Sequence, residues 1–420
     1  MTAFTRRDGV LYVEGVRAAA LAEAAGTPLY VYGAGTLRDR YQRLDAALGG
    51  VPHRIHYSLK ANASRGILDQ LRAVGSGVDV VSGGELFKAL RAGFPASDIL
   101  FGGVGKSDAE LRDAIVAGVK MINVESVAEI ERIAAIAASL GATPAVGLRV
   151  NPEVAVSNAH HYIATGEKGH KFGIPYDEAF AAGESVLAHP ALRLVGLDMH
   201  VGSQLHAFDA YADGARRLGE LAERLRAAGA PLRYLDVGGG LPVPYEREAE
   251  PDLAAFAALV VPVAQRLRLE LLVEPGRFFA AATGGLLTRV LYVKQSGGTT
   301  FVICDAGMTE LLRPSHYDAY HKIEAVAPRG ARTTADVVGP VCETGDFLAL
   351  GREMDAVEPG DLLAVHTTGA YGYVMASNYN ARPRAAEVMV DGSRWATVTA
   401  RESYAELVHL DVENPQWRDA

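Results

Sequence analysis

A regular alternation of short apolar runs with alanine- and leucine-rich stretches constrains the fold of this 420-residue chain. Between about residues 27 and 275, eight runs have the length of β-strands, and the stretches between them have helical periodicity. The first four runs end near Lys60, Ser82, Gly103 and Glu125, at intervals of 22, 21 and 22 residues. A strand, a turn and a short helix fit each interval, so the sequence predicts a (β/α)₈ barrel of the TIM type.

Three of the predicted helices begin with the same signal. Ser-x-x-Glu occurs at residues 82–85, 107–110 and 126–129, each time ahead of apolar residues at helical spacing. In a capping box the serine side chain accepts a backbone N–H of the first turn, and the glutamate accepts the N–H of the serine. Three matches in succession support the predicted order of strands and helices.

The chain after about residue 280 has a different pattern. Its β-rich runs, such as 300–307, are separated by Gly, Pro and Asp turns, which predicts a β-sandwich or β-barrel domain. The opening segment also contains a strand-like run and is expected to join that domain. The predicted organisation is therefore α/β, with a barrel at 27–278 inserted between the two parts of a β domain, 1–26 and 279–420.

Composition narrows the class of protein. The 41 basic and 50 acidic residues are spread along the chain, which argues against a nucleic-acid partner. The two cysteines, Cys304 and Cys342, are too few for a disulfide framework and fit a cytoplasmic location. No apolar run is long enough to span a membrane, and the first residues lack the apolar core of a signal peptide. The composition predicts a cytoplasmic enzyme acting on a small molecule, and no metal site is predicted.

The active site of such a barrel lies at the carboxyl ends of its strands. The first strand ends on Lys60, whose stem is expected among apolar residues, so that its amine loses a proton readily and attacks an aldehyde. Strands seven and eight are followed by residues 238–240, a triple glycine, and 274–277, where barrel enzymes often bind phosphate. Asp79 and Arg149 are further polar groups near this mouth, without an assigned role. Taken singly, most lysines are solvated surface charges and a triple glycine is only a tight turn.

The combination of these groups points to pyridoxal phosphate. Lys60 would bind the cofactor aldehyde, the glycine loops its phosphate, and Glu274 would keep the pyridine nitrogen protonated so that the ring withdraws electrons. His200, at the end of the sixth strand, is predicted to stack on the ring, with Ser203 near the phosphate. A core histidine satisfied by hydrogen bonds is the alternative for His200.

A series of motifs in a fixed order connects the chain to a known family. They are YSLKAN (57–62), GVDVVSGGEL (77–86), HKFGI (170–174), HVGSQ (200–204), DVGGG (236–240), EPGR (274–277), RPSHYDAYH (313–321), GPVCETGD (339–346) and GAYGYVMASNYN (369–380). With them the chain resembles the fold-type III pyridoxal-phosphate decarboxylases over essentially its whole length. RPSHYDAYH and GPVCETGD are similar to the diaminopimelate decarboxylase branch. The resemblance implies an alanine-racemase-like barrel, and a homodimer in which the neighbouring subunit's C-terminal domain completes each active site.

The resemblance, together with the strand-end residues above, implies three sets of site residues. The predicted cofactor contacts are Lys60, His200, Ser203, Gly239, Glu274, Pro275, Gly276, Arg277 and Tyr371. The predicted substrate contacts are Arg277, Arg313, Tyr317, Glu343 and Tyr371. The predicted catalytic residues are Lys60, His200 and Cys342, the last as proton donor. The familiar serine after Cys-Glu is Thr344 here, a departure that leaves the roles of Cys342 and Glu343 unchanged.

The charges of the implied substrate contacts favour meso-diaminopimelate, which carries a carboxylate and an ammonium on the carbon remote from the reaction. Arg277, Arg313 and Glu343 supply both complementary charges. Ornithine or lysine would leave a buried arginine unpaired, at a cost of several kcal/mol. The predicted reaction releases carbon dioxide and forms L-lysine, the last step of lysine biosynthesis. Cys342 suits the protonation step because an unperturbed cysteine has a pKa of about 8.5, whereas Cys304 is expected to be a buried apolar residue.

Other enzymes on the same scaffold are alternatives: an alanine racemase, an ornithine or arginine decarboxylase, or a decarboxylase of a siderophore or antibiotic intermediate. A racemase would use a lysine and a tyrosine as opposed bases and have a smaller pocket. From another class, a non-catalytic pyridoxal-phosphate carrier would not need a β domain with Cys342, Glu343 and Tyr371. Release of carbon dioxide from meso-diaminopimelate separates these possibilities. The segment 151–173 is a candidate lid.

Overall fold

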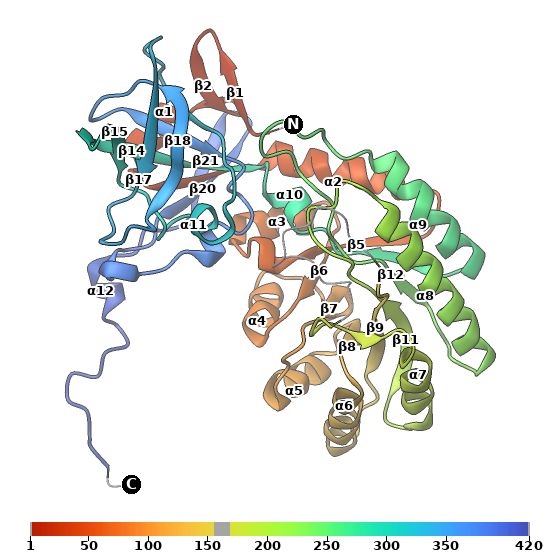
Figure 1. Ribbon diagram of the computed structural model, residues 1–420. Coiled ribbons are helices and arrows are strands. Elements are labelled where there is room, and N and C mark those ends of the chain that lie inside the picture. Colours follow the sequence, from red (N-terminus) through yellow and green to blue (C-terminus); the bar gives the residue numbers. More distant parts are fainter. Residues whose placement is uncertain (1, 155–168, 419–420) are drawn as a thin grey trace. The chain divides into compact units, whose positions relative to one another are not determined.

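The computed structural model describes residues 2–154 and 169–418 of the chain, which divides into two compact units (Figure 1). One unit is 34–282, and the other combines 1–33 with 283–420. Most of the candidate lid, from 155 to 168, lies outside the described residues.

The unit 34–282 is a closed barrel of eight parallel strands, each paired with the next. In spatial order they are β5 (His53–Ser58), β6 (Gly77–Val80), β7 (Ile99–Phe101), β8 (Met121–Val124), β9 (Ala145–Asn151), β11 (Arg193–Asp198), β12 (Tyr234–Asp236) and β13 (Glu270–Val273). The ring closes because β13 pairs with β5. The short β10 (Ile174–Pro175) pairs in parallel with the last two residues of β9. The prediction of an eight-stranded TIM-type barrel is confirmed, and each predicted run overlaps one of these strands.

Helices surround the barrel strands (Figure 1). Seven follow a strand: α3 (Arg65–Ala73), α4 (Gly83–Arg91), α5 (Asp108–Ala117), α6 (Val127–Leu140), α7 (Ala179–Ala188), α8 (Asp209–Ala227) and α9 (Leu253–Leu267). The eighth, α2 (Ala34–Leu48), precedes the first strand and packs against α3 and α9. Short helical turns are η1 (Leu59–Ala61), η2 (Ala96–Asp98) and α10 (Arg277–Ala280). Six strands contribute to a buried core inside the ring: Leu100, Met121, Ala145, Val195, Tyr234 and Leu272.

The three predicted helix starts differ in how their glutamates bond. Ser107 forms the complete capping box, in which Glu110 accepts the N–H of Ser107 itself. At the starts of α4 and α6 the serine accepts the helix N–H as predicted, but the glutamate accepts the N–H of the residue before the serine. The backbone explains the difference, because φ is −77° at Ser107 but −156° and −157° at Ser82 and Ser126. The more extended serines bring the preceding N–H toward the helix.

The second unit is built on a nine-stranded sheet. Its path runs through β18 (Phe347–Asp355), β17 (Arg332–Val338), β15 (Thr299–Cys304), β14 (Gly284–Ser296), β4 (Leu29–Gly33), β20 (Ala386–Asp391) and β21 (Arg394–Thr399), while β19 (Leu362–His366) pairs with β14 and with β16 (Ile323–Ala325). A separate three-stranded sheet contains β1 (Phe4–Arg7), β2 (Val10–Val13) and β3 (Val16–Arg17). The remaining helices are α1 (Ala18–Ala25), α11 (Arg313–Tyr317), η3 (Tyr373–Met375), η4 (Tyr379–Ala381) and α12 (Tyr404–Leu407).

Both ends of the chain contribute to the core of this β domain. Leu11 and Val31 from the N-terminal part are fully buried in one cluster with Leu287 and Val388 from the C-terminal part. Strand β4 pairs with β14 and β20 of this sheet, so the barrel begins at residue 34 rather than at 27 as expected. Among the helices that the structure describes, none combines the length and the apolar character needed to cross a membrane.

Candidate active site

Lys60 lies just after the first barrel strand. Strand β5 ends at Ser58, and Lys60 is part of the 3₁₀ turn η1 rather than of the strand. Its Nζ lies 3.6 Å from Oδ2 of the buried Asp79, and its side chain is 39% exposed. The expectation that Lys60 is desolvated is therefore wrong, because the barrel gives its ammonium a carboxylate partner and a solvated position. Ser58 orients that partner, since its hydroxyl donates to Asp79 Oδ2 at 2.9 Å.

Three carboxyl groups that end neighbouring strands gather beside this pair. Asp198, Asp236 and Glu274 are buried, with side-chain oxygens within 4.8 Å of one another. Burial, followed by the neighbouring carboxyls, raises the pKa of Asp236 and of Glu274 well above the usual range. Burial also raises the pKa of Asp198 to about 7, against the opposing effect of Arg149. These shifts mean that the cluster retains protons at neutral pH.

Arg149 supplies the cation of this cluster. Its Nη1 lies 2.6 Å from Glu125 Oε1, and its Nε lies 3.9 Å from Asp198 Oδ2. Asn123 also donates to Asp198 Oδ2, at 3.1 Å. Arg149 was predicted only as a polar group near the mouth, and the structure now gives it two carboxylate partners from β11 and from the end of β8.

The loops after β11, β12 and β13 meet around a glycine turn. Gly238 and Gly240 have φ of 71° and 107°, and a side chain on Gly239 would come within 2.3 Å of the carbonyl oxygen of Glu274. The triple glycine is therefore needed for close approach of the backbone as well as for the turn. Arg277, the first residue of α10, brings its Nε and Nη2 to 3.3 and 3.1 Å from Ser203 Oγ. A cation, a hydroxyl and a glycine turn thus lie where a phosphate was predicted.

His200 bonds to the same glycine turn. Its Nδ1 accepts the N–H of Gly239 at 3.2 Å, so a single ring proton belongs on Nε2. Burial, with smaller contributions from Lys60 and Arg149, holds the pKa of His200 well below its usual value. The imidazole is therefore a neutral, flat group at neutral pH. Such a group suits the predicted stacking on a pyridine ring.

The chemistry of these barrel groups fits pyridoxal phosphate. Lys60 offers the amine, and Arg277, Ser203 and the glycine turn form a cradle that side chains would fill. Glu274 offers a buried carboxyl for the ring nitrogen.

Several residues of this region were not predicted from the sequence. Asp198 and Asp236 end apolar strands shortly before His200 and the glycine turn, and an acid at such a position was the available signal. Tyr245 was also missed, although its hydroxyl accepts from Arg277 Nη1 at 2.8 Å. No sequence signal distinguishes it from other loop tyrosines.

The predicted substrate residues of the β domain lie on α11 and on two loops. Arg313 begins α11 and is buried, whereas Tyr317 ends it and is partly exposed. Cys342 and Glu343 are both exposed. The Cys342 N–H donates to Asn380 Oδ1 at 3.1 Å, and a hydrogen bond to Glu343 raises the pKa of Tyr379. Tyr371 follows β19 with φ of 56°, a left-handed backbone conformation that is uncommon outside glycine.

Asp346 anchors the loop that carries Cys342 and Glu343. Its Oδ2 accepts the N–H of Val341 and its Oδ1 the N–H of Met308, both at 2.6 Å. Asp346 belongs to the GPVCETGD motif, but no sequence signal indicates this anchoring role.

Cys304 is fully buried in β15. Burial raises the pKa of its thiol to about 12. The prediction that Cys304 is an inert apolar residue is confirmed by its burial.

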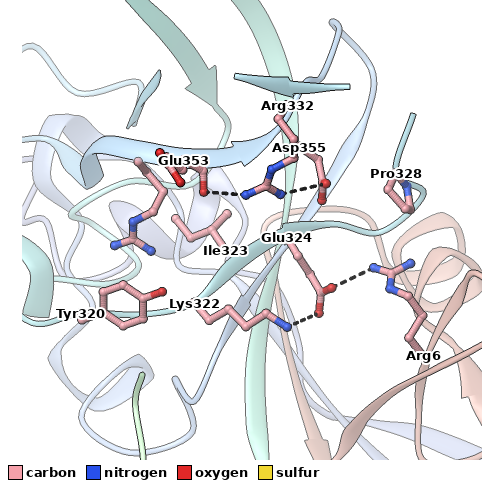
Figure 2. Close-up of a pocket in the computed structure, with 10 residues that line it drawn as sticks. Arg6, Tyr320, Lys322, Ile323, Glu324, Pro328, Arg332, Glu353 and Asp355 are labelled. Atoms are coloured by element: carbon pink, nitrogen blue, oxygen red, sulfur yellow. Dashed lines mark hydrogen bonds and ion pairs between the residues drawn. The ribbon is translucent and has the colours of Figure 1, made fainter. Parts of the chain in front are cut away.

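A cavity of about 330 Å³ in the β domain lies apart from these loops (Figure 2). Its lining residues are Arg6, Tyr320, Lys322, Ile323, Glu324, Pro328, Arg332, Arg352, Glu353 and Asp355. Figure 2 shows that charged groups of the lining bond to one another: Glu324 pairs with Arg6 at 3.0 Å and Lys322 at 3.2 Å, and Arg332 pairs with Asp355 at 3.1 Å. These pairs connect β1 with β16, and β17 with β18. None of the predicted site residues is among the lining residues.

Comparison with known proteins assigns the barrel to a family. Residues 34–281 match the model of the pyridoxal-binding domain of the pyridoxal-dependent decarboxylases. The chain belongs to the pyridoxal-dependent decarboxylases. As a member of this family it uses pyridoxal phosphate as its cofactor.

Relatives of this pyridoxal-dependent decarboxylase extend the similarity to the β domain. The diaminopimelate decarboxylase of Neisseria meningitidis serogroup A is 46% identical over 394 residues, covering 94% of this chain and 97% of that protein. The structure of the Helicobacter pylori diaminopimelate decarboxylase complexed with L-lysine is 37% identical, with a TM-score of 0.90, and covers 94% of this chain and 98% of that one. The M. jannaschii enzyme in co-complex with L-lysine is 33% identical, with a TM-score of 0.93 and 99% coverage of both chains.

Proposed function

We propose that this decarboxylase removes carbon dioxide from meso-2,6-diaminopimelate and forms L-lysine, the last step of lysine biosynthesis. The observation that carries the proposal is full-length similarity to diaminopimelate decarboxylases, which spans both the barrel and the β domain. The β domain contributes the residues that recognise this substrate in the proposal.

The residues of the barrel mouth would hold the cofactor. Pyridoxal phosphate bound there supplies an electron sink for the carbanion that departing carbon dioxide leaves behind. In this proposal Lys60 binds the aldehyde carbon of the cofactor, and Gly239, Ser203 and Arg277 bind its phosphate. Glu274 contacts the ring nitrogen and His200 the face of the ring. Further contacts come from Pro275, Gly276 and Tyr371. Neutral His200 places no charge against the ring.

Two side chains of the β domain would recognise the charged groups on the remote carbon of the substrate. Arg313 would bind its carboxylate through two parallel hydrogen bonds, and Glu343 would pair with its ammonium. Tyr317, Tyr371 and Arg277 complete the proposed substrate contacts. Because lysine and ornithine offer no carboxylate at the end remote from the reacting carbon, they leave this arginine without its anion.

Cys342 would deliver the proton that replaces the lost carboxyl group. When the carbon–carbon bond breaks, its electron pair stays with the substrate carbon, and the thiol of Cys342 donates a proton to that carbon. Asp346 would keep the thiol in place through the loop that it anchors. Solvent then restores the proton on the sulfur.

The working form in this proposal is a homodimer with shared active sites. Cys342 and Glu343 are exposed in the single chain, whereas a carbanion needs protection from bulk water. A second copy of the chain would provide this protection. The proposed location is the cytoplasm, supported by the content of only two cysteines.

The decisive test measures the carbon dioxide and the amino-acid product that the purified protein forms when it is supplied with pyridoxal phosphate. We expect equal amounts of carbon dioxide and L-lysine from meso-diaminopimelate, and turnover of L-lysine or L-ornithine at least about 100-fold slower, in line with the loss of a charged contact. Comparable turnover of either control amino acid would overturn the substrate assignment.

A further inference from the structure

We propose that His321 is a positioning residue that fixes the guanidinium of Arg313 in the orientation that receives the remote carboxylate of the substrate. The inference rests on the proposed function, because it assumes the assigned role of Arg313. It adds a residue that does not itself touch the substrate. His321 closes the RPSHYDAYH motif, which begins with Arg313.

The two side chains meet inside the β domain. Arg313 is 8% exposed and His321 is fully buried. Nη1 of Arg313 lies 3.0 Å from Nε2 of His321, and Nδ1 of His321 lies 2.9 Å from the backbone carbonyl oxygen of His366. The imidazole therefore bridges a helix start, where Arg313 lies, and the end of strand β19.

The chemistry of the partners fixes the state of the imidazole. A guanidinium is always protonated and only donates, so Nε2 of His321 must accept. A carbonyl oxygen only accepts, so Nδ1 must carry the ring proton. His321 is thus neutral with a single tautomer, and each of its nitrogens has a defined partner.

The backbone of His321 is held as well. Its carbonyl oxygen accepts Nη1 of Arg352 at 2.7 Å, and the guanidinium of Arg352 lies 4.0 Å from the ring centre of Tyr320. On the other side, the N–H of His366 donates to the carbonyl oxygen of Lys322 at 2.9 Å. Because the backbones of His321 and His366 are both held, the position of the imidazole is set before any substrate binds.

A fixed guanidinium matters because two parallel hydrogen bonds to a carboxylate require a defined plane. A hydrogen bond from Nη1 to His321 orients that plane and reduces the freedom that Arg313 loses on binding. Such preorganisation strengthens binding of substrate and transition state equally. The expected signature is a change in KM with little change in kcat.

The test compares three substitutions of His321 in the holoenzyme. His321→Gln can still accept from Arg313, whereas His321→Asn is too short to reach it but can still donate to the carbonyl of His366. We expect His321→Asn and His321→Ala to raise the KM for meso-diaminopimelate about tenfold, and His321→Gln to stay within about threefold of the parent, as for one hydrogen bond to a charged group. Lys322→Ala is the control, since this neighbouring side chain pairs with Glu324.

Inhibition constants separate positioning from damage to the fold. L-Lysine retains the carboxylate of the remote carbon, whereas 1,5-diaminopentane lacks it. The inhibition constant of L-lysine should rise in parallel with KM in His321→Asn, and that of 1,5-diaminopentane should not change. A parallel rise for both inhibitors, or equal KM values for His321→Asn and the parent, would overturn the role of His321.

Arg313→Ala distinguishes this inference from the proposed function. If Arg313→Ala raises KM while His321→Asn does not, only the positioning role fails. If Arg313→Ala leaves KM and the L-lysine inhibition constant unchanged, the assigned role of Arg313 fails and the inference about His321 fails with it.

Discussion

The carboxyl groups of Asp236 and Glu274 lie within 4.8 Å of each other, and each has a buried oxygen for which the described residues provide no hydrogen-bond donor. Two acceptors in such a place are stable only if a proton lies between them. Asp236 Oδ1 already accepts the N–H of Gly238 at 2.9 Å, so Oδ2 of Asp236 is the natural carrier of that proton. Asp236 would then donate to Glu274 and help to keep it available for the pyridine nitrogen.

This relationship predicts that Asp236→Asn preserves cofactor binding. An asparagine keeps the acceptor for Gly238 and places an N–H where the acid proton lies. We expect its dissociation constant for pyridoxal phosphate, titrated by absorbance, to remain within about threefold of the parent, and Asp236→Ala to weaken binding about tenfold or more. Equal losses in both variants would show that Asp236 is needed as an anion.

A second prediction concerns the proposed covalent role of Lys60. Lys60→Arg keeps a cation beside Asp79 but cannot form the covalent bond to the cofactor, so turnover should fall by at least about 1000-fold. The imine absorption band of the parent holoenzyme should be lost, as it should in Lys60→Ala. Borohydride reduction of the parent followed by peptide mapping should place the cofactor on Lys60. A label on another lysine would contradict the assignment.

Asp198 should make the stability of the protein depend on pH. The pKa of its carboxyl is raised to about 7 in the folded protein, whereas an unfolded aspartate has a pKa of about 4. The folded state therefore holds a proton that the unfolded chain releases, and this stabilisation, complete below about pH 4, is lost as pH rises through 7. The melting temperature of the parent should decrease between pH 5 and pH 8. In Asp198→Asn we expect this decrease to be smaller by a few °C.

The matched control for this measurement is Asp213→Asn, in helix α8, which follows β11 in the barrel but exposes Asp213 to solvent. It should leave the pH dependence unchanged. An Asp198→Asn protein with the parent's full slope would show that the carboxyl of Asp198 titrates normally.

The two cysteines should differ in reactivity toward iodoacetamide. Cys342 is exposed in the single chain, and in the proposed dimer it faces a site that a small amino acid must enter, whereas burial raises the pKa of Cys304 to about 12, and the thiolate is the reactive form. At pH 8 we expect one label per folded chain, located on Cys342 by mass spectrometry, and two labels after denaturation. Labelling of Cys304 in the folded protein would contradict its placement in the core.

The proposed shared site predicts recovery of activity by mixing. Lys60→Ala and Cys342→Ala homodimers should each be inactive. Mixed dimers should contain one intact site if Lys60 and Cys342 act across the interface. Random re-association of equal amounts should restore about a quarter of the parent activity. No recovery, with mixed dimers verified by native mass spectrometry, would mean that each site is built within one chain.

The sequence contains enough information to predict the barrel but not the residue at which the barrel begins. Eight strand-like runs, the first four at nearly equal intervals, and three serine caps identify the barrel because these signals are local. Strand β4 at Leu29–Gly33 also has a strand-like sequence, but its partners β14 and β20 lie more than 250 residues away. No local sequence pattern predicts which sheet such a strand joins.

The site shows the same division between local and long-range information. Lys60, His200 and the glycine turn follow predicted strands, so their positions near the barrel mouth could be expected. The ion pair of Lys60 with Asp79, and the proton-holding cluster of Asp198 with its neighbours, depend on side chains from different strands. Their burial and mutual repulsion arise only when the barrel closes.

The pairing of β4 with β14 and β20 has a consequence for synthesis on the ribosome. Residues 2–33 emerge before the barrel, yet the strands that β4 must join emerge only after the whole barrel has been translated. The barrel can fold before residues 2–33 have strands to pair with. Until then the apolar side chains of Leu11, Val31 and their neighbours stay unburied. In the nascent chain this segment is therefore exposed to chaperones and to aggregation, and a stop codon before β20 would leave β4 without one of its two partner strands.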